Sequence, residues 1–541
     1  MTMATLCLFV LLHLFLIPVA ISAVEYLTVD TEEGTLRGQM GETYTGKPMY
    51  RFEGIPYAEP PVGDLRFQPP VQKSAWTGVK DVLKKGNSCL QYSNGKASGS
   101  EDCLYLSVFG PGTPSRNGTL KNVMVFIHGG CFTSGSGNAR PQYFVDLDVI
   151  VIHLNYRLGL LGFLSTGDEV VPGNMGLKDQ AEALRWVQRN IEAFGGDPQK
   201  VTIYGQSAGS ASVHYHVLSP LSKGLFKSAI AMSGSASNAW AFTKNATDRA
   251  LRFAKYLGYT GKTSTDLLNF LKTVNASTLV KNITVALSEE DSLSLFSCVW
   301  TPTAEPEHDG AFLTEQPWTL VAEGRYNLVP FMAGDTDLER LKQTQKGGAL
   351  YTEEQVSNLN ENFDEIVGCD LRLPTREEQL KAAASIKEFY YNGSDITVQD
   401  NYTTCLLESH RFFVEGVDAA IRSMARYSSN PVYYYQFSFV GTRSTFPHGP
   451  GAAHNDDVKY MHATDSLDPD SSGGIIRSQM ISMWTNFAKY DNPTPEETSI
   501  LTETWKEYDE SSPYYLEINR PLQLKTNLYE PYMTFWHNLL P

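Results

Sequence analysis

Basic residues are scarce in this sequence of 541 residues. Lys and Arg number 44 against 60 Asp and Glu, which gives a formal net charge of −16. Nucleic acids and anionic membrane surfaces are bound through basic patches, so this balance argues against both as partners. The sequence also lacks a spacing of His and Cys residues typical of a metal site. We therefore expect neither nucleic acid nor a metal ion.

Long hydrophobic runs are absent after the N-terminal stretch. Residues 6–20 are apolar but too few to span a bilayer, and small residues at 20–23 supply a cleavage site. This pattern predicts a signal peptide over residues 1–23 and a mature chain over 24–541, with an uncleaved membrane anchor as the alternative. Residues 535–541 form neither a lipid-anchor tail nor an ER-retention tetrapeptide. We expect a secreted, extracellular protein without a membrane anchor.

Cysteine is also rare, with 7 in the chain. Cys7 would leave with the signal peptide. Cys89 and Cys103 flank a short polar loop and are expected to pair, which would stabilise the fold by about 3 kcal/mol in the chain-entropy model. Such a disulfide fits an oxidising compartment.

The other four cysteines leave the pairing open. Cys369 and Cys405 could form a second disulfide, although connectivity cannot be read from sequence, and Cys131 and Cys298 are expected to stay as thiols. Six N-x-[ST] triplets, each weak alone, agree with a secreted glycoprotein. Their asparagines are Asn117, Asn245, Asn275, Asn282, Asn392 and Asn401.

No linker, repeat or low-complexity tract divides residues 24–541, so we predict one large α/β domain with long insertions. Uniformly apolar stretches at 123–127 and 149–153 predict strands buried on both faces. A helix is expected over 174–194, where apolar residues form one stripe, and a further strand over 200–204. This alternation is typical of a mostly parallel sheet covered by helices.

The pentapeptide Gly-Gln-Ser-Ala-Gly at 205–209 lies between that strand and a predicted helix ending before Ser219-Pro220. A G-x-S-x-G in this context is typical of a nucleophile elbow, in which Ser207 sits on a strained turn. Glycines on both sides let the neighbouring backbone come close, and the helix N-terminus points free N–H groups at the reacting atoms. The alternative is a chance match in a Gly- and Ser-rich loop.

A second Gly-rich turn follows the strand at 123–127, where the chain continues as His-Gly-Gly-Cys-Phe at 128–132. A strand that ends in Gly-Gly offers backbone N–H groups in an unusual conformation, as an oxyanion hole requires. An ordinary glycine turn is the alternative.

The chain resembles the type-B carboxylesterase family, which also contains the cholinesterases and has the α/β-hydrolase fold. The resemblance covers almost the whole mature chain in order. Gln206, together with residues 451–457, is similar to the pattern of insect juvenile hormone esterases. The matching stretches are 51–52, 101–106, 128–130, 155–157, 179–180, 205–209, 226–230, 233–234, 451–457 and 484–488.

The resemblance implies a triad with Ser207. His454, in a Gly-rich loop after the strand predicted at 432–439, would be the base, with His448 as its nearest rival. The family places its acid five residues after Gly334, which gives Glu339, whereas Asp337 is the alternative acid. Arg340 stands where the family has a glycine, a departure that bears on the local turn.

The implied reaction is carboxylic-ester hydrolysis without a cofactor. His454 takes the proton of Ser207 as it attacks an ester carbonyl, and water later releases the acid from acyl-Ser207. The N–H groups of Gly130, Cys131 and Ala208 would bind the oxyanion, where losing one donor typically costs about 3 kcal/mol. The Cys131 thiol would narrow the pocket, and Ser233 is implied to support the triad.

Two other classes of protein stay open. A non-catalytic adhesion protein on the same fold usually has lost the serine or histidine and carries a transmembrane segment, neither of which applies here. A cholinesterase would hold a tryptophan in the loop closed by the first disulfide, but residues 90–102 contain only Tyr92 as an aromatic residue. The expected substrate is a small apolar ester, with juvenile hormone, odorants or pheromones and xenobiotics as possibilities. Oligomeric state is not indicated.

Overall fold

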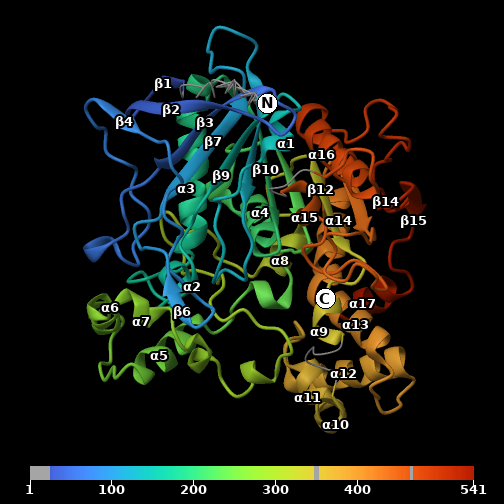
Figure 1. Ribbon diagram of the computed structural model, residues 1–541. Coiled ribbons are helices and arrows are strands. Elements are labelled where there is room, and N and C mark those ends of the chain that lie inside the picture. The colour runs from blue at the N-terminus through green and yellow to red at the C-terminus, as the bar shows by residue number, and fades with distance from the viewer. Residues whose placement is uncertain (1–24, 346–351, 463–466, 541) are drawn as a thin grey trace, which may run out of the picture.

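The computed structural model describes residues 25–345, 352–462 and 467–540 (Figure 1). The predicted signal peptide, residues 1–23, lies outside them. The described chain is built on one 13-stranded sheet with the strand order β1-β2-β3-β7-β9-β8-β10-β11-β12-β13-β14-β15, and β4 pairs with β2. A second sheet contains only β5 and β6.

The strands have the following bounds: β1 Tyr26–Thr31, β2 Gly34–Glu42, β3 Pro48–Pro56, β4 Val79–Asp81, β5 Gln91–Ser93, β6 Lys96–Ser98, β7 Tyr105–Pro111, β8 Lys121–Ile127, β9 Ile150–Leu154, β10 Gly196–Gln206, β11 Ser228–Met232, β12 Phe331–Thr336, β13 Val432–Phe437, β14 Tyr514–Ile518 and β15 Gln523–Thr526. The helices are α1 Gln142–Val145, α2 Gly159–Phe163, α3 Met175–Asn190, α4 Ala208–Leu218, α5 Ala246–Tyr256, α6 Ser264–Thr273, α7 Ala276–Leu279, α8 Pro317–Glu323, α9 Leu341–Thr344, α10 Glu353–Glu361, α11 Phe363–Gly368, α12 Arg376–Tyr391, α13 Asn401–Ser409, α14 Glu415–Tyr427, α15 Val458–Met461, α16 Ser472–Tyr490 and α17 Tyr532–Leu539.

The centre of the large sheet is parallel. Strands β9, β8, β10, β11, β12, β13 and β14 pair in parallel along this order, whereas the pairings outside this stretch of the main order are antiparallel. Parallel strands need crossover helices, which bury both faces of the sheet. The prediction of a mostly parallel sheet flanked by helices is therefore confirmed.

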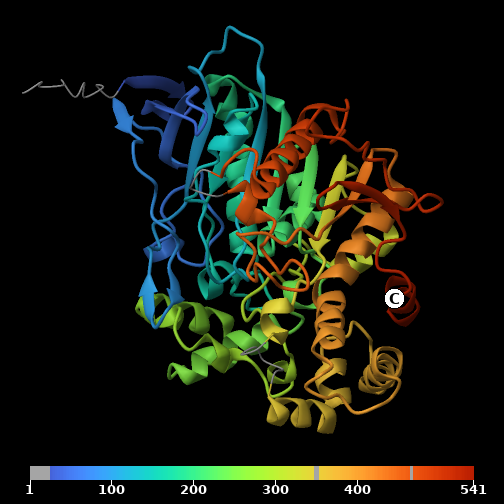
Figure 2. The same cartoon turned by 45° about the vertical axis from the view of Figure 1, so that its right-hand side comes forward.

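Side chains of β8 show how one strand serves both faces. Val123, Val125 and Ile127 belong to the hydrophobic core on one side, while Met124 and Phe126 belong to the core on the other. This follows from the period of two in a strand. Helices α3 and α4 complete the first core, and α16, which crosses the near side of the sheet in Figure 2, contributes to the second.

The carboxyl ends of the parallel strands meet at one edge of the sheet. Helices α5–α7 and α10–α12 lie below the sheet in both views (Figures 1 and 2). Loops that leave β8, β10, β12 and β13 therefore converge, and ligands of open parallel sheets bind at this edge. The helix predicted over 174–194 is shorter, because α3 ends at Asn190 and a 3₁₀ turn, η2, continues to Phe194.

Candidate active site

Ser207 occupies a sharp turn between β10 and α4. Its backbone angles are φ 60° and ψ −124°, a conformation that non-glycine residues rarely adopt. A Cβ added to Gly205 would lie 2.4 Å from the Gly209 carbonyl oxygen, and one added to Gly209 would lie 2.0 Å from that of Ile127. Only glycine fits at either position, so the pentapeptide has the geometry of a nucleophile elbow.

Glu339 is fully buried after the end of β12, with both carboxylate oxygens engaged. One oxygen accepts hydrogen bonds from the Ser233 hydroxyl at 2.6 Å and from the Thr336 N–H at 2.7 Å. The other accepts from Nδ1 of His454 in a short contact. The carboxylate is thereby fixed in one orientation, and it fixes the imidazole in turn.

His454 presents its other ring nitrogen to the elbow. Nε2 lies 3.2 Å from the side-chain amide nitrogen, Nε2, of Gln206, the residue before Ser207. Because Nδ1 donates its proton to Glu339, Nε2 is unprotonated, and its lone pair accepts the hydrogen bond of this amide. A general base needs this tautomer. The structure therefore brings the predicted base and acid together, and it places the imidazole against the side chain of Gln206, the neighbour of the predicted nucleophile, with no hydrogen bond between His454 and Ser207 among the described residues.

The loop after β8 lies against the elbow. A Cβ on Gly129 would lie 2.9 Å from the Cβ of Ser207, and one on Gly130 would lie 2.1 Å from the Ser134 carbonyl oxygen. Gly130 and Cys131 both have positive φ, 110° and 56°. Within residues 25–345, 352–462 and 467–540, neither of their N–H groups has a hydrogen-bond acceptor. The loop thus holds two free donors beside Ser207.

Ala208 supplies a third donor. It is the first residue of α4, and the first N–H groups of a helix have no intrahelical acceptor. Three backbone donors near a nucleophile form the arrangement that stabilises a tetrahedral oxyanion.

The disulfide pattern differs from the expected one. Cys89 is joined to Cys103, but Cys131 and Cys298, expected as thiols, form a second disulfide with a Cα–Cα distance of 5.4 Å. Cys369 and Cys405, which could have paired, remain unpaired. The prediction failed because Cys131 and Cys298 lie 167 residues apart, and only the tertiary fold brings their Cα atoms within disulfide range.

Asp337, the alternative acid, has another partner. Its carboxylate accepts the Ala452 N–H at 2.7 Å, and burial raises its pKa to about 7. Asp457 is similar, since burial and then the charge of Glu339 raise its pKa to about 7. His448, the rival base, has no contact with Glu339 in the described part of the chain. The hydrogen bonds of His454 and Glu339 thus favour these two as the pair.

Arg340 packs away from the imidazole. Its N–H donates to the Ser409 hydroxyl at 3.0 Å, and its guanidinium lies 4.7 Å from the ring centre of Phe296. One guanidinium nitrogen is 3.5 Å from Glu408, which is buried with it. Arg340 in place of the family's glycine therefore does not prevent the hydrogen bond between the Glu339 carboxylate and His454.

Phe413 is a site residue that sequence reasoning missed. It belongs to the π-helical turn η7, His410–Val414, between α13 and α14, and its ring lies 4.7 Å from that of His454. π-Helical turns are rare and are frequent at functional sites. One inserted residue does not disturb the apolar pattern of the flanking helices enough to be seen, so no signal in the sequence pointed to this turn.

The six predicted glycosylation asparagines all reach the surface. Asn117, Asn245, Asn275, Asn282 and Asn392 are exposed, and Asn401 is partly exposed. Their accessibility is compatible with glycan attachment, which stays a prediction.

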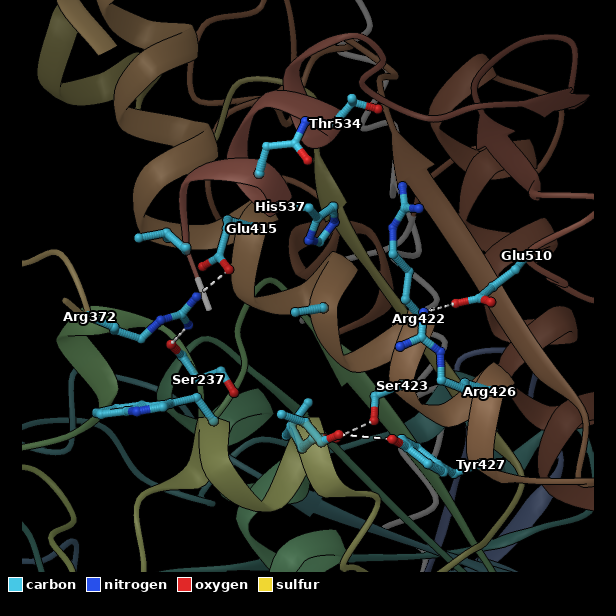
Figure 3. A pocket seen from close by; sticks show the side chains of 16 residues that line it. Ser237, Arg372, Glu415, Arg422, Ser423, Arg426, Tyr427, Glu510, Thr534 and His537 are labelled. Carbon is cyan, nitrogen blue, oxygen red and sulfur yellow. Dashed lines mark hydrogen bonds and ion pairs between the residues drawn. The ribbon is translucent and has the colours of Figure 1, made fainter. Parts of the chain in front are cut away.

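A cavity of about 440 Å³ lies apart from Ser207, Glu339 and His454, between α8, α14 and α17 (Figure 3). Arg372 and Arg426 each pair with a carboxylate, on Glu415 and Glu510. Arg422 pairs with Asp418 at 2.6 Å. Because the arginines are neutralised within the wall, this cavity has no evident anion-binding role.

The buried acids predict a pH dependence of stability. An aspartate in an unfolded chain titrates near 3.9, whereas Asp337 and Asp457 have pKa values of about 7 when folded. Between these values the folded state binds more protons, so the free energy of unfolding should fall as pH rises from about 4 to 7. Asp337→Asn keeps an acceptor for Ala452 and cannot ionise.

This variant should therefore gain stability relative to wild type at pH 8, by about 4 kcal/mol, and gain only about 1 kcal/mol at pH 4.5. Urea unfolding at the two pH values measures the difference. An equal effect at both would show that Asp337 is ionised throughout.

Comparison with known proteins agrees with the geometry. The sequence model described as the carboxylesterase family matches residues 25–536. Esterase FE4 of Myzus persicae is 35% identical over 512 residues, covering 91% of this chain and 90% of its own. A carboxylic ester hydrolase of Bombus ignitus is 33% identical, covering 94% of each chain. Juvenile hormone esterase of Tribolium castaneum is 34% identical, covering 87% of this chain and 84% of its own.

Among the described helices, none has the length and apolarity needed to cross a membrane.

Proposed function

The chain belongs to the carboxylesterase family and is a carboxylic-ester hydrolase of the α/β-hydrolase fold, and we propose that it hydrolyses apolar esters through an acyl-serine intermediate on Ser207. Membership of an enzyme family sets aside the non-catalytic adhesion protein. The observation that carries the proposal is the orientation of His454, with Nδ1 on Glu339 and Nε2 toward the elbow.

The proposed reaction begins with proton transfer from Ser207 to Nε2 of His454 as the hydroxyl oxygen attacks the ester carbonyl. Glu339 stabilises the imidazolium that forms and keeps its ring in place. The N–H groups of Gly130, Cys131 and Ala208 receive the negative charge of the tetrahedral intermediate. The alcohol leaves with the proton from His454, and a water molecule, activated in the same way, releases the acid from Ser207.

Aromatic side chains near the base support an apolar substrate. The ring of Phe413 lies 4.7 Å from His454 and 5.6 Å from Trp240, and Trp240 lies 6.4 Å from Phe132, the residue after Cys131. A row of buried apolar rings thus packs from the base to the loop of the proposed oxyanion hole. Burying substrate methylenes there would contribute about 0.8 kcal/mol each.

Juvenile hormone is the more specific substrate that we propose. It is a long apolar chain ending in a conjugated methyl ester, whose carbonyl is a poor electrophile, so binding along the chain must compensate. Gln206 and residues 451–457 support this choice, as does the 34% identity with a protein named juvenile hormone esterase. Odorant, pheromone and xenobiotic esters are the alternatives.

We also propose that residues 1–23 are a signal peptide and that residues 24–541 form one secreted domain. Two disulfides support an oxidising compartment, and the six exposed or partly exposed sequons fit a glycoprotein.

The proposal predicts a rate that rises with substrate apolarity. Along naphthyl acetate, propionate and butyrate, kcat/KM should rise by about fourfold per added methylene, because each methylene is transferred from water to the apolar surroundings of the site. Steady-state kinetics on the purified chain measure this. A flat series, or a preference for choline esters, would contradict an apolar site.

The same assay separates the hormone from general esters. A KM for juvenile hormone in the low micromolar range is expected, against a weaker KM for naphthyl acetate. A hormone KM at or above about 1 mM would leave a general carboxylesterase.

A further inference from the structure

We propose that the disulfide between Cys131 and Cys298 is a positioning element that holds the backbone N–H of Cys131 in the oxyanion hole. The inference rests on the proposed function, because it assumes that this N–H binds the oxyanion. The sulfur atoms take no part in the reaction; the bond acts through the backbone of Cys131.

The backbone of this loop is in a conformation that L-residues avoid. Cys131 and Phe132 both have φ 56°, in the left-handed region, and they follow Gly130 at φ 110°. Side chains with a Cβ are disfavoured there, and such residues persist only where the surroundings hold them. Relaxation of Cys131 to negative φ would turn its N–H away from Ser207.

Hydrogen bonds hold the residues on either side but not Cys131 itself. The Gly130 carbonyl accepts from the N–H groups of Thr133 and Ser134, both at 3.0 Å, and the Phe132 carbonyl accepts from Gly159 at 2.7 Å. For Cys131, no hydrogen bond is present to any residue that the structure describes. The disulfide is therefore its anchor.

The other end of the anchor is firmly held. Cys298 is buried, at 3% exposure, and the next carbonyl, of Val299, accepts from the Arg249 guanidinium at 2.9 Å. Residues 294–297, directly before Cys298, have no regular secondary structure, so side-chain contacts and the disulfide fix their place.

The side-chain contacts of residues 295–298 reach the surroundings of the proposed acid, Glu339, and of the proposed base, His454. The carbonyl of Leu295 accepts from Arg340, the neighbour of Glu339, at 3.2 Å. The ring of Phe296 stacks on that of Phe413 at 5.7 Å, and Phe413 lies against His454. Residues 295–298 thus contact the surroundings of the acid and the base and are bonded to the oxyanion loop. The disulfide sets the distance between the loop and this shared segment.

The test is a double-mutant cycle on the full chain with Cys131→Ala, Cys298→Ala and the pair. All three variants keep every backbone donor. We expect kcat for naphthyl butyrate to fall by about 10- to 100-fold, less than the loss of a whole donor, with KM within about threefold. Because either substitution breaks the same bond, the singles and the double should lose kcat equally.

A transition-state analogue provides the readout that a general loss of stability would not move. An aryl trifluoromethyl ketone adds to Ser207 and places an oxyanion in the hole, so its affinity should fall by the same factor as kcat/KM. Cys369→Ala removes a cysteine that forms no disulfide and is the matched control, expected to keep wild-type kcat.

If the double variant does not fold, the wild-type protein is treated with dithiothreitol under native conditions. The reagent supplies two electrons and two protons, the S–S bond becomes two thiols, and dithiothreitol closes to its cyclic disulfide. Cys131 is partly exposed, whereas Cys89 and Cys103 are both buried, so the second disulfide should be reduced first. The loss of kcat should follow the alkylation of Cys131 by iodoacetamide, mapped by mass spectrometry.

If the cysteine variants keep the kcat and the analogue affinity of the wild type and show only a lower unfolding temperature, the inference is overturned and the disulfide only stabilises the fold. A raised KM at constant kcat would overturn it too. The proposed function fails separately, if Ser207→Ala retains activity; its failure does not depend on the cysteine variants.

Discussion

Ser207→Ala is expected to lower kcat for ester hydrolysis by about 10⁴- to 10⁶-fold, the range found when the nucleophile of a serine hydrolase is removed. The reason is that no acyl-enzyme can form, and the oxyanion donors alone give only weak catalysis over water. Hydrolysis of naphthyl butyrate, measured beside an inactive blank, gives the residual rate.

The fold of this variant should be unchanged. The side chain of Ser207 makes no hydrogen bond within the described ranges, so its hydroxyl contributes little to stability. Alanine has the same Cβ as serine and meets the same backbone strain at φ 60°. Its thermal unfolding temperature should lie within a few degrees of that of the wild type.

Covalent labelling gives an independent check. An organophosphate should modify Ser207 of the wild-type protein and leave the other serines of α4, such as Ser210 and Ser212, unlabelled. These two donate their hydroxyl protons to backbone carbonyls, of Gly234 at 2.6 Å and Ala208 at 2.8 Å. Modification of another serine, or turnover near normal in Ser207→Ala, would remove the proposed triad.

The elbow could be predicted from local sequence because its physical requirement is local. Positions 205 and 209 accept only glycine, because a Cβ at either would lie within 2.4 Å of a backbone carbonyl oxygen. The strand before this pentapeptide and the helix after it can also be recognised from the local sequence. The oxyanion loop shares this property, since Gly130 needs its positive φ whatever the rest of the chain does.

Glu339 and His454 could be assigned only by resemblance. They lie 115 residues apart and meet because β12 and β13 are parallel neighbours whose carboxyl ends lie together. Strand order is a long-range property, to which no short stretch of sequence points. The disulfide of Cys131 and the contact of Phe413 with His454 were missed for the same reason.

Glu339→Gln is expected to lower kcat by about 10³- to 10⁴-fold, with little change in KM. Glutamine keeps an oxygen for the Ser233 hydroxyl and the Thr336 N–H, which donate to one carboxylate oxygen at 2.6 and 2.7 Å. The amide nitrogen then faces Nδ1 of His454 and donates where the carboxylate accepted. This places the imidazole proton on Nε2 and removes the lone pair that deprotonates Ser207.

Asp337→Asn is the matched control, because it also replaces a carboxylate by an amide, two residues away in the same loop. Its carboxylate accepts from Ala452, not from His454, and its pKa of about 7 means that it is about half protonated at pH 7 and largely protonated in acid solution. An amide resembles that protonated form, so kcat should stay within about threefold of wild type. Parallel kinetics and unfolding curves of the two variants separate catalysis from folding. A large loss of kcat in Asp337→Asn with near-normal kcat in Glu339→Gln would transfer the role of the acid to Asp337. Only substitution of the residue that orients His454 should lower kcat while the free energy of unfolding stays unchanged.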